Sequence, residues 1–148
     1  MHKLADQVQA NIQIPLLHIA DATGEAVLAQ ELQTVALLGT RFTMEEDFYR
    51  GRLEDKYNLQ VLIPSAEDRG VVHDVIYDEL VQGIINPTSR QTYLSIIDRL
   101  VERGAQGIVL GCTEIGLLVK PEHTQTPLFD TTLIHVQAAV DWVLGEGP

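Results

Sequence analysis

A single cysteine follows a short apolar run and is the most reactive side chain in the sequence. Residues 108–110 (IVL) are typical of a buried strand, Gly111 ends the run, and Cys112, the only cysteine among 148 residues, comes next. A strand-to-helix turn of this kind is where open α/β sheets place ligands. A helix opening at Thr113 or Glu114 would favour the thiolate, the basic form of cysteine. Cys112 is therefore a candidate acid–base group; the alternative is a buried cysteine that packs as a small hydrophobe.

Three more side chains are candidates for the same site. Thr113 and Glu114 adjoin the cysteine, so each can contact a substrate or cap a helix. Thr40 ends another predicted strand and either lines the site or serves its turn. The five histidines and one cysteine lack metal-ligand spacing, so we predict no metal site. Other polar residues near predicted strand ends are interpreted as caps or structural residues: His18, Asp130, Thr131 and His135.

Length and composition indicate one globular domain. The chain is 45% hydrophobic and 21% charged, which is typical of soluble proteins. A net charge of −11 disfavours nucleic acids and anionic membranes as partners, but leaves room for a small-molecule substrate. No apolar run approaches the roughly 20 residues of a membrane span. The polar start predicts no signal peptide, and a lone cysteine builds no disulfide framework, so we expect a cytoplasmic protein.

Apolar runs alternate with helical patterns along the whole chain. The predicted strands are residues 14–20, 34–38, 59–63, 108–110 and 126–129. The predicted helices are residues 1–11, 22–30 capped by Asp21, 43–57 with a Thr43–Glu46 capping box, 65–83 capped by Ser65, 88–104 with a Thr88–Gln91 capping box, and 131–145 capped at Asp130. This alternation is typical of βαβ units. It predicts one α/β domain over residues 1–148, with a doubly wound, Rossmann- or flavodoxin-like parallel sheet flanked by helices.

The last predicted helix has two apolar faces. One face carries Ile134, Ala138 and Trp142, and the other carries Val136, Val140 and Val143. Such a pattern is typical of a helix that is buried against two surfaces.

Several segments, taken in order, resemble motifs of the aspartate/glutamate racemase family, including its broad-specificity members. Those similar to its second half are residues 35–43 (VALLGTRFT) with 47–49 (DFY), 111–115 (GCTEI) and 129–135 (FDTTLIH). Residues 1–3 (MHK) and 17–23 (LHIADAT) are similar to the middle of the broad-specificity members. The resemblance implies one half of a pseudo-symmetric two-domain α/β fold. It also implies an enzyme that needs no bound cofactor, neither pyridoxal phosphate nor any other.

The family's reaction uses two cysteines, because inversion at Cα needs a base and an acid on opposite faces of a planar carbanion. By resemblance, Cys112 is the second cysteine, and the backbone N–H and hydroxyl of Thr113 bind the substrate carboxylate. The first cysteine motif is missing and would lie upstream of Met1. The chain thus resembles a C-terminal portion, in which residues 1–13 are a remnant helix and residues 131–145 would pack back on the missing half.

The sequence is compatible with several functions. We expect a racemase for aspartate, glutamate or a similar amino acid, with this chain nearly inactive alone. One alternative is a single-cysteine decarboxylase or a cis–trans isomerase of the same superfamily. Another is a non-catalytic α/β domain that dimerises through its exposed surface, or that receives the first half from a partner chain. The family's lysine for the substrate side chain has no clear match, although Arg69 and His73 lie nearby.

Overall fold

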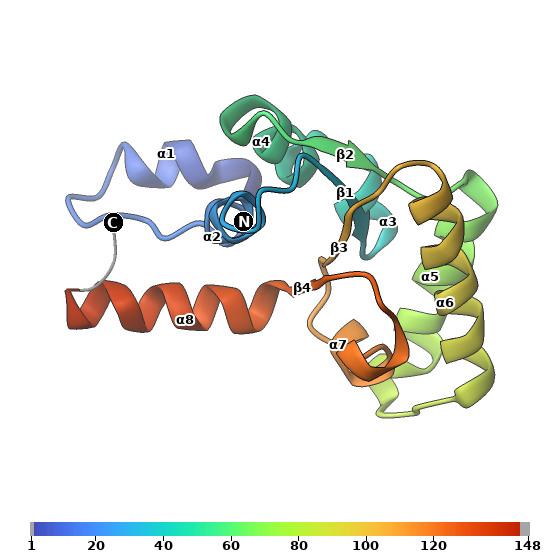
Figure 1. Ribbon diagram of the computed structural model, residues 1–148. Coiled ribbons are helices and arrows are strands. Elements are labelled where there is room, and N and C mark those ends of the chain that lie inside the picture. Colours follow the sequence, from blue (N-terminus) through green and yellow to red (C-terminus); the bar gives the residue numbers. More distant parts are fainter. Residues whose placement is uncertain (1, 146–148) are drawn as a thin grey trace.

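Four parallel strands form the centre of the molecule. The computed structural model describes residues 2–145 and places the strands in the order β2-β1-β3-β4 (Figure 1). The strands are β1 (Thr34–Leu38), β2 (Gln60–Leu62), β3 (Gly107–Leu110) and β4 (Leu128–Asp130). Leu38 pairs with Leu110, and Leu110 pairs with Asp130, so β1, β3 and β4 end side by side. The predicted parallel α/β sheet is confirmed.

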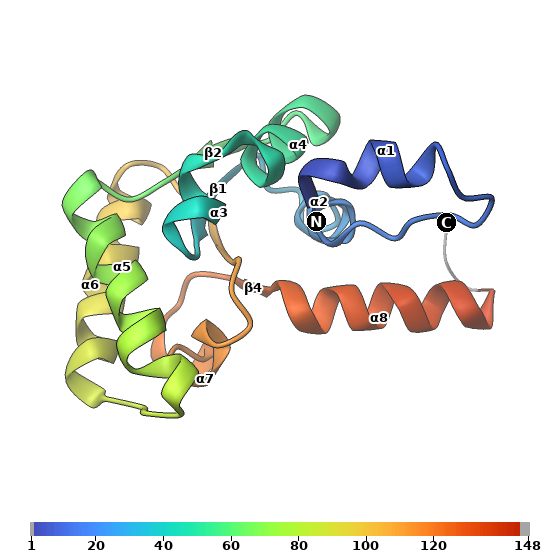
Figure 2. The ribbon, with the colours of Figure 1, turned by 180° about the vertical axis from the view of Figure 1, so that it is seen from behind.

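Helices cover both faces of this sheet, as the doubly wound prediction requires. Helices α5 and α6 lie on one side and α2, α4 and α8 on the other (Figures 1 and 2). The helices are α1 (Ala5–Gln9), α2 (Ile19–Leu28), α3 (Arg41–Glu45), α4 (Asp47–Tyr57), α5 (Ala66–Asp78), α6 (Pro87–Glu102), α7 (Ile115–Leu118) and α8 (Thr131–Leu144). Short 3-10 turns are η1 (His2–Leu4), η2 (Leu80–Gln82) and η3 (Pro121–His123).

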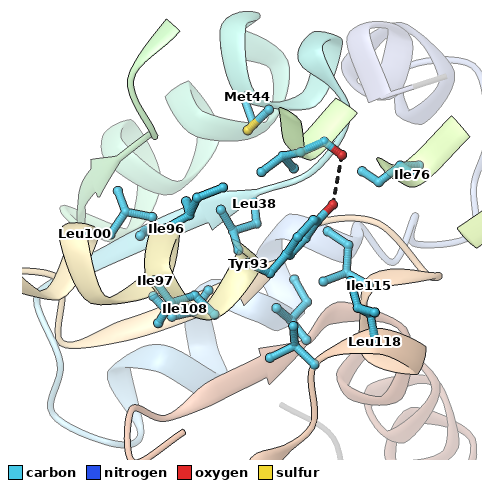
Figure 3. Close-up of a cluster of buried hydrophobic side chains, with 14 of the residues drawn as sticks. Leu38, Met44, Ile76, Tyr93, Ile96, Ile97, Leu100, Ile108, Ile115 and Leu118 are labelled. Carbon is cyan, nitrogen blue, oxygen red and sulfur yellow. Dashed lines mark hydrogen bonds between the residues drawn. The ribbon is translucent and has the colours of Figure 1, made fainter. Parts of the chain in front are cut away.

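The face towards α5, α6 and α7 is an apolar core. Alternate residues of a strand share a face, so Ala36 and Leu38 of β1 point here with Ile108 and Leu110 of β3. Figure 3 shows Tyr93 of α6 in the middle of this cluster. Its hydroxyl donates a hydrogen bond of 2.8 Å to the backbone oxygen of Val72, which satisfies the buried hydroxyl group.

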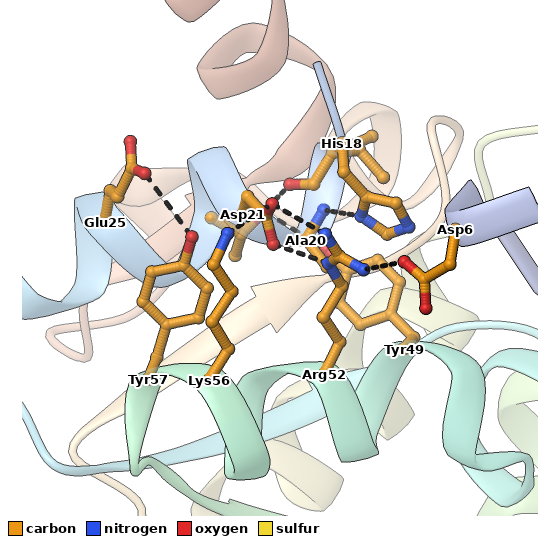
Figure 4. A network of polar contacts seen from close by, with 11 residues as sticks. Asp6, His18, Ala20, Asp21, Glu25, Tyr49, Arg52, Lys56 and Tyr57 are labelled. Carbon is orange, nitrogen blue, oxygen red and sulfur yellow. Dashed lines mark hydrogen bonds and ion pairs between the residues drawn. The ribbon is translucent and has the colours of Figure 1, made fainter. Parts of the chain in front are cut away.

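On the opposite face, the ion pairs of Asp21 with Arg52 and Lys56 join α2 to α4, and we call this cluster the lock. Arg52 donates two hydrogen bonds to the Asp21 carboxylate, at 2.6 and 2.9 Å, and Lys56 donates a third at 2.7 Å (Figure 4). Burial alone would raise the pKa of Asp21, but these bonds outweigh it and lower that pKa to about 2. Below the ion pair, Val35 and Leu37 pack with Leu53.

The strand predicted over residues 14–20 is wrong. Residues 15–18 are irregular, and α2 begins at Ile19. The buried His18 caps this helix by accepting a hydrogen bond of 3.1 Å from the Ala20 amide. Asp21, the predicted cap, lies in the first turn, where its carboxylate binds Arg52. A short apolar run does not separate a strand from a helix entry by periodicity alone.

Two other predicted helix starts are wrong by two or three residues. Helix α3 is capped by Thr40 rather than Thr43, and the chain breaks at Glu46 before α4. Asn86, not Thr88, caps α6, because Pro87 suits the first helical position, where no amide donor is needed. The predicted caps of α5 and α8, Ser65 and Asp130, are confirmed.

Helix α8 is buried on one side only. Ile134 packs in the cluster shared with α2, whereas Val136, Val140 and Val143 are exposed. Within residues 2–145 the second apolar face has no packing surface, and packing of residues 131–145 on a missing half stays a prediction. The ends of the predicted domain, residue 1 and residues 146–148, lie outside the described residues.

Candidate active site

The turn after β3 is held tightly against the turn after β1. The Gly111 amide donates a hydrogen bond of 2.7 Å to the Leu38 oxygen. A Cβ atom at Gly111 would lie 2.9 Å from Leu37 Cδ1 and 3.0 Å from the Leu38 oxygen, so only glycine fits without movement. These contacts bring Cys112 and Thr40 to neighbouring strand ends.

Cys112 is half-buried against the core and hydrogen-bonded to a carboxylate. Its Sγ donates to Glu114 Oε2 at 3.0 Å. Burial, helped by this negative neighbour, raises the pKa of Cys112 to about 12, and the bond from the thiol in turn lowers the pKa of Glu114. At neutral pH the sulfur is therefore a thiol beside an ionised Glu114.

The expectation that a helix dipole favours the thiolate is wrong for this arrangement. Helix α7, which begins at Ile115, spans only four residues and so has little dipole. The backbone amides of Thr113 and Glu114 act on the sulfur and lower its pKa, but burial outweighs them. Cys112 therefore keeps its proton at neutral pH.

Of the other predicted site residues, two adjoin the cysteine. The exposed Thr113 donates a side-chain hydrogen bond to Glu114, which also lowers the pKa of that carboxyl. Thr40 lies at the end of β1, where its Oγ1 is 3.1 Å from Thr43 Oγ1 and accepts from the Thr43 amide at 3.4 Å. The structure therefore joins Cys112, Thr113 and Glu114 in one cluster, with Thr40 engaged in its own turn.

Neighbours that sequence reasoning left out of the site also line these turns. His73 Nδ1 accepts a hydrogen bond of 3.2 Å from the Arg41 amide, next to Thr40. Asp130 caps α8, and a Cβ atom at Gly116 would lie 2.8 Å from its Oδ2, so its carboxylate borders α7. No sequence spacing signals either neighbour, because the fold brings together positions far apart in the chain.

Other polar residues near the strand ends have structural partners. The Thr131 hydroxyl donates to the Leu110 oxygen at 2.9 Å and ties β4 to β3. Arg69 pairs with Glu45 at 2.8 Å and donates to the Pro64 oxygen. His135 lines a small cavity with His18, on the α2 side of the sheet.

A cavity of about 500 Å³ lies outside this cluster. It opens between η1, α1 and α4, with cationic and acidic side chains around it. Arg52 and Lys56 border it, but both bind Asp21. Among residues 2–145 no three His, Cys, Asp or Glu side chains are arranged to hold a metal ion. Within that same part of the chain, no helix has the length and apolar character to cross a membrane.

Two solved structures resemble the chain closely. A candidate Asp/Glu racemase from Yersinia pestis is 50% identical with a TM-score of 0.94, over 97% of this chain and 63% of its own. An aspartate racemase homologue from Pyrococcus horikoshii is 32% identical with a TM-score of 0.88, over 95% of this chain and 62% of its own. This chain therefore spans less than two thirds of either protein.

A shorter relative and a family model complete the comparison. An uncharacterized protein of Pectobacterium carotovorum, encoded in the pnlA 3′ region, is 28% identical over 129 residues, 86% of this chain and 84% of its own length. The model of the Asp/Glu/hydantoin racemase family matches residues 1–139. Since that match takes in both Cys112 and the sheet that positions it, the chain belongs to the Asp/Glu/hydantoin racemase family.

Proposed function

We propose that this chain supplies one of the two thiols of a cofactor-independent racemase acting on aspartate, glutamate or a similar amino acid. The observation that carries the proposal is the Cys112 thiol at the carboxyl end of β3, with its Sγ 3.0 Å from Glu114 Oε2. Family membership and the racemase relatives support a racemase-type reaction.

In the proposed reaction Cys112 is the acid for one direction of inversion. A base on the far side of the substrate removes the Cα proton, and the electron pair of that bond stays on Cα. The S–H bond of Cys112 then breaks as its proton joins the opposite face, which leaves a thiolate. The Glu114 carboxylate keeps the proton on sulfur until the far more basic carbanion forms. In the reverse direction the two groups exchange roles.

The residues around the thiol are proposed to hold the substrate. The amide and hydroxyl of Thr113, together with Thr40 at the neighbouring strand end, are suited to an α-carboxylate, because N–H and O–H donors stabilise the charge that develops there. Glu114 offers a negative partner for the α-ammonium group. The overall charge of −11 does not oppose this binding, since the site acts through its local field.

In this two-thiol mechanism the second thiol comes from polypeptide outside these 148 residues, since Cys112 is their only cysteine. The solved relatives are longer by more than a third of their own length. We therefore expect that this chain alone does not interconvert L- and D-aspartate or L- and D-glutamate.

The test is exchange of the Cα proton in deuterated water. The purified chain and a Cys112→Ser variant are incubated separately with each enantiomer of aspartate and of glutamate between pH 7 and 10, and the Cα proton is followed by NMR. We expect slow exchange of one enantiomer without formation of the other, faster at high pH because more thiolate forms, and absent in the variant. Accumulation of the opposite enantiomer would contradict the two-thiol mechanism. Equal exchange in both proteins would remove Cys112 from the reaction, and no exchange at any pH would contradict substrate binding by this segment.

A further inference from the structure

His18 is a buried histidine whose hydrogen bond exists in one protonation state only. Its side chain is 3% exposed, and its Nδ1 accepts a hydrogen bond of 3.1 Å from the Ala20 amide, which caps α2 (Figure 4). A ring nitrogen that carries a proton is a donor and cannot accept a hydrogen bond. Uptake of a proton at Nδ1 would therefore leave two donors facing each other at the start of the helix.

The other ring nitrogen of His18 also disfavours a charge. Nε2 is buried and has no hydrogen-bond partner among residues 2–145. In the neutral ring this nitrogen carries the proton, and in the imidazolium it would carry part of a charge without an acceptor or solvent around it. Burial, followed by the positive charge of Arg52, lowers the pKa of His18 to about 4.

The charged side chains around the ring do not compensate for its burial. Arg52 of α4 is a cation and opposes a second positive charge on His18. Asp21 of α2 and Asp6 of α1 favour that charge, but Arg52 pairs with both carboxylates, at 2.6 and 3.5 Å (Figure 4). Both carboxylates that act on the ring are thus already engaged.

Two further histidines meet His18 at a small cavity. The ring centroid of His2, in η1, lies 5.2 Å from that of His18, and His135 of α8 lines the same cavity of about 70 Å³. Burial lowers the pKa of His2 as well. Because histidines gain their charge as the pH falls below neutrality, acid brings mutually repelling cations to the place where η1, α2 and α8 meet.

The N-terminal segment, residues 2–17, is held beside this cavity by few buried contacts. His2 stacks on Phe48 of α4 with ring centroids 5.8 Å apart, and Ala5 is the one buried residue of the segment. The Asp6 side chain, 95% exposed, adds an ion pair to α4 that contributes little. A segment with so few buried contacts opens at a small cost in free energy.

We propose that His18 is an acid-sensitive latch, whose protonation ends the α2 cap and releases the N-terminal segment from α2, α4 and α8. In the neutral state the ring closes the helix end and fills the joint between the segment and α2. In the protonated state it loses the cap and carries a charge beside Arg52 and His2. The segment then opens while the sheet stays folded, because the strands are buried in their own two cores.

The direction of the pH dependence follows from the two states of the latch. The closed state holds the His18 proton less tightly than the open state, in which the ring has its ordinary pKa of 6.5. Closure is therefore fully favoured above about pH 6.5 and weakens as the pH falls towards 4.

Hydrogen exchange read by mass spectrometry between pH 7.5 and 5.0, corrected for the intrinsic pH dependence of exchange, tests the latch. In wild type, peptides that cover residues 2–22 should lose protection at least about tenfold over this range, whereas peptides from β3 keep theirs. His18→Asn retains a side chain that can cap a helix but does not titrate, so its protection should change less than about twofold. The matched control is His123→Asn, because His123 Nδ1 also accepts an amide, that of Lys120 at 3.1 Å, but outside this joint. This control should behave like wild type.

An NMR titration of the His18 ring in wild type is a second measurement, which does not require any variant to fold. Its midpoint should lie well below the ordinary 6.5. A midpoint at 6.5 or above overturns the proposal, as does protection of residues 2–22 that stays constant with pH or falls as steeply in His18→Asn as in wild type. Equal loss of protection in β3 overturns it too, because the whole chain would then unfold. None of these results depends on the proposed racemase reaction.

Discussion

The carboxylates of Asp21 and Glu114 both accept hydrogen bonds from side chains, but they have opposite effects on their partners. Asp21 accepts from Arg52 and Lys56, which are cations, so each charge stabilises the other. Glu114 accepts from the Cys112 thiol, and its charge opposes ionisation of that thiol. The pKa of both carboxyls is lowered. The same interaction therefore locks two helices in one place and holds a reactive proton in the other.

The difference follows from the partner's chemistry. Arginine and lysine stay charged at all ordinary pH values, so the Asp21 lock changes only when Asp21 itself takes up a proton. A thiol titrates within reach of physiological pH, so a neighbouring carboxylate alters its reactivity. We expect changes at Asp21 to alter stability alone, and changes at Glu114 to alter thiol chemistry alone.

The largest expected effect is on folding. Asp21→Asn leaves Arg52 and Lys56 side by side without their counter-charge, and should lower the free energy of unfolding by about 2 kcal/mol. Urea unfolding followed by circular dichroism measures it. The control Glu25→Gln removes a charge whose one side-chain bond is a long 3.4 Å contact from the exposed Tyr57 hydroxyl, and should cost under about 0.5 kcal/mol. Equal losses in the two variants would show that the lock contributes nothing specific.

The next largest effect is on how the free energy of unfolding depends on pH. The pKa of Asp21 is about 2 in the folded chain against 3.8 as the ordinary value, so the folded state holds its proton less tightly. This contribution is fully present above about pH 4 and is lost as the pH falls towards 2. Allowing for the solvent that reaches the pair, the stability gap between wild type and Asp21→Asn should narrow by about 1 to 2 kcal/mol from pH 5 to pH 2. A gap that stays constant over this range would contradict the lowered pKa.

The same two regions show what the sequence could and could not predict. The strand before Cys112 was predictable because residues 108–110 are apolar and end at a glycine, and the structure confirms that strand. The candidate cluster of Cys112, Thr113 and Glu114 was predictable because its members are neighbours in the chain. Whether they form the racemase site stays a prediction.

The protonation state and the lock were not predictable. Whether the pKa of Cys112 is raised or lowered depends on how deeply the sulfur is buried and on which way the Glu114 side chain points. The lock joins Asp21 to Arg52, 31 positions apart, and only the packing of α2 on α4 brings them together. Local patterns place residues on elements, but tertiary contacts decide their charge and partners.

A smaller effect is expected on the rate at which the Cys112 thiol is alkylated. Glu114→Gln removes the charge beside Cys112, so the pKa of the thiol should fall from about 12 but stay raised by burial. Alkylation by iodoacetamide near pH 9 should then speed up about threefold to tenfold, because a tenfold rise in thiolate corresponds to one pKa unit. Cys112 is the only cysteine, so the modified mass reports it directly. Glu102→Gln, at an exposed position that ends α6, should leave the rate unchanged.

The control that separates the two regions is Asp21→Asn in the same alkylation assay. Distant sites without shared partners act independently, so its rate should match wild type wherever both proteins are folded. A Glu114→Gln rate equal to wild type from pH 7 to 11 would show that the hydrogen bond does not hold the proton.

The smallest expected effect is on the same alkylation rate when Thr113 is replaced. It tests whether the charge of Glu114 or its position keeps the proton on sulfur. Thr113→Val removes the hydroxyl that hydrogen-bonds Glu114, so the pKa of the Glu114 carboxyl should rise towards its usual value. That carboxyl nevertheless stays ionised at pH 9, and the thiol still faces a full negative charge. We therefore expect the alkylation rate of Cys112 to change less than about twofold. A change as large as that of Glu114→Gln would mean that Thr113 positions the carboxylate, and that its orientation, not its charge, keeps the proton on sulfur.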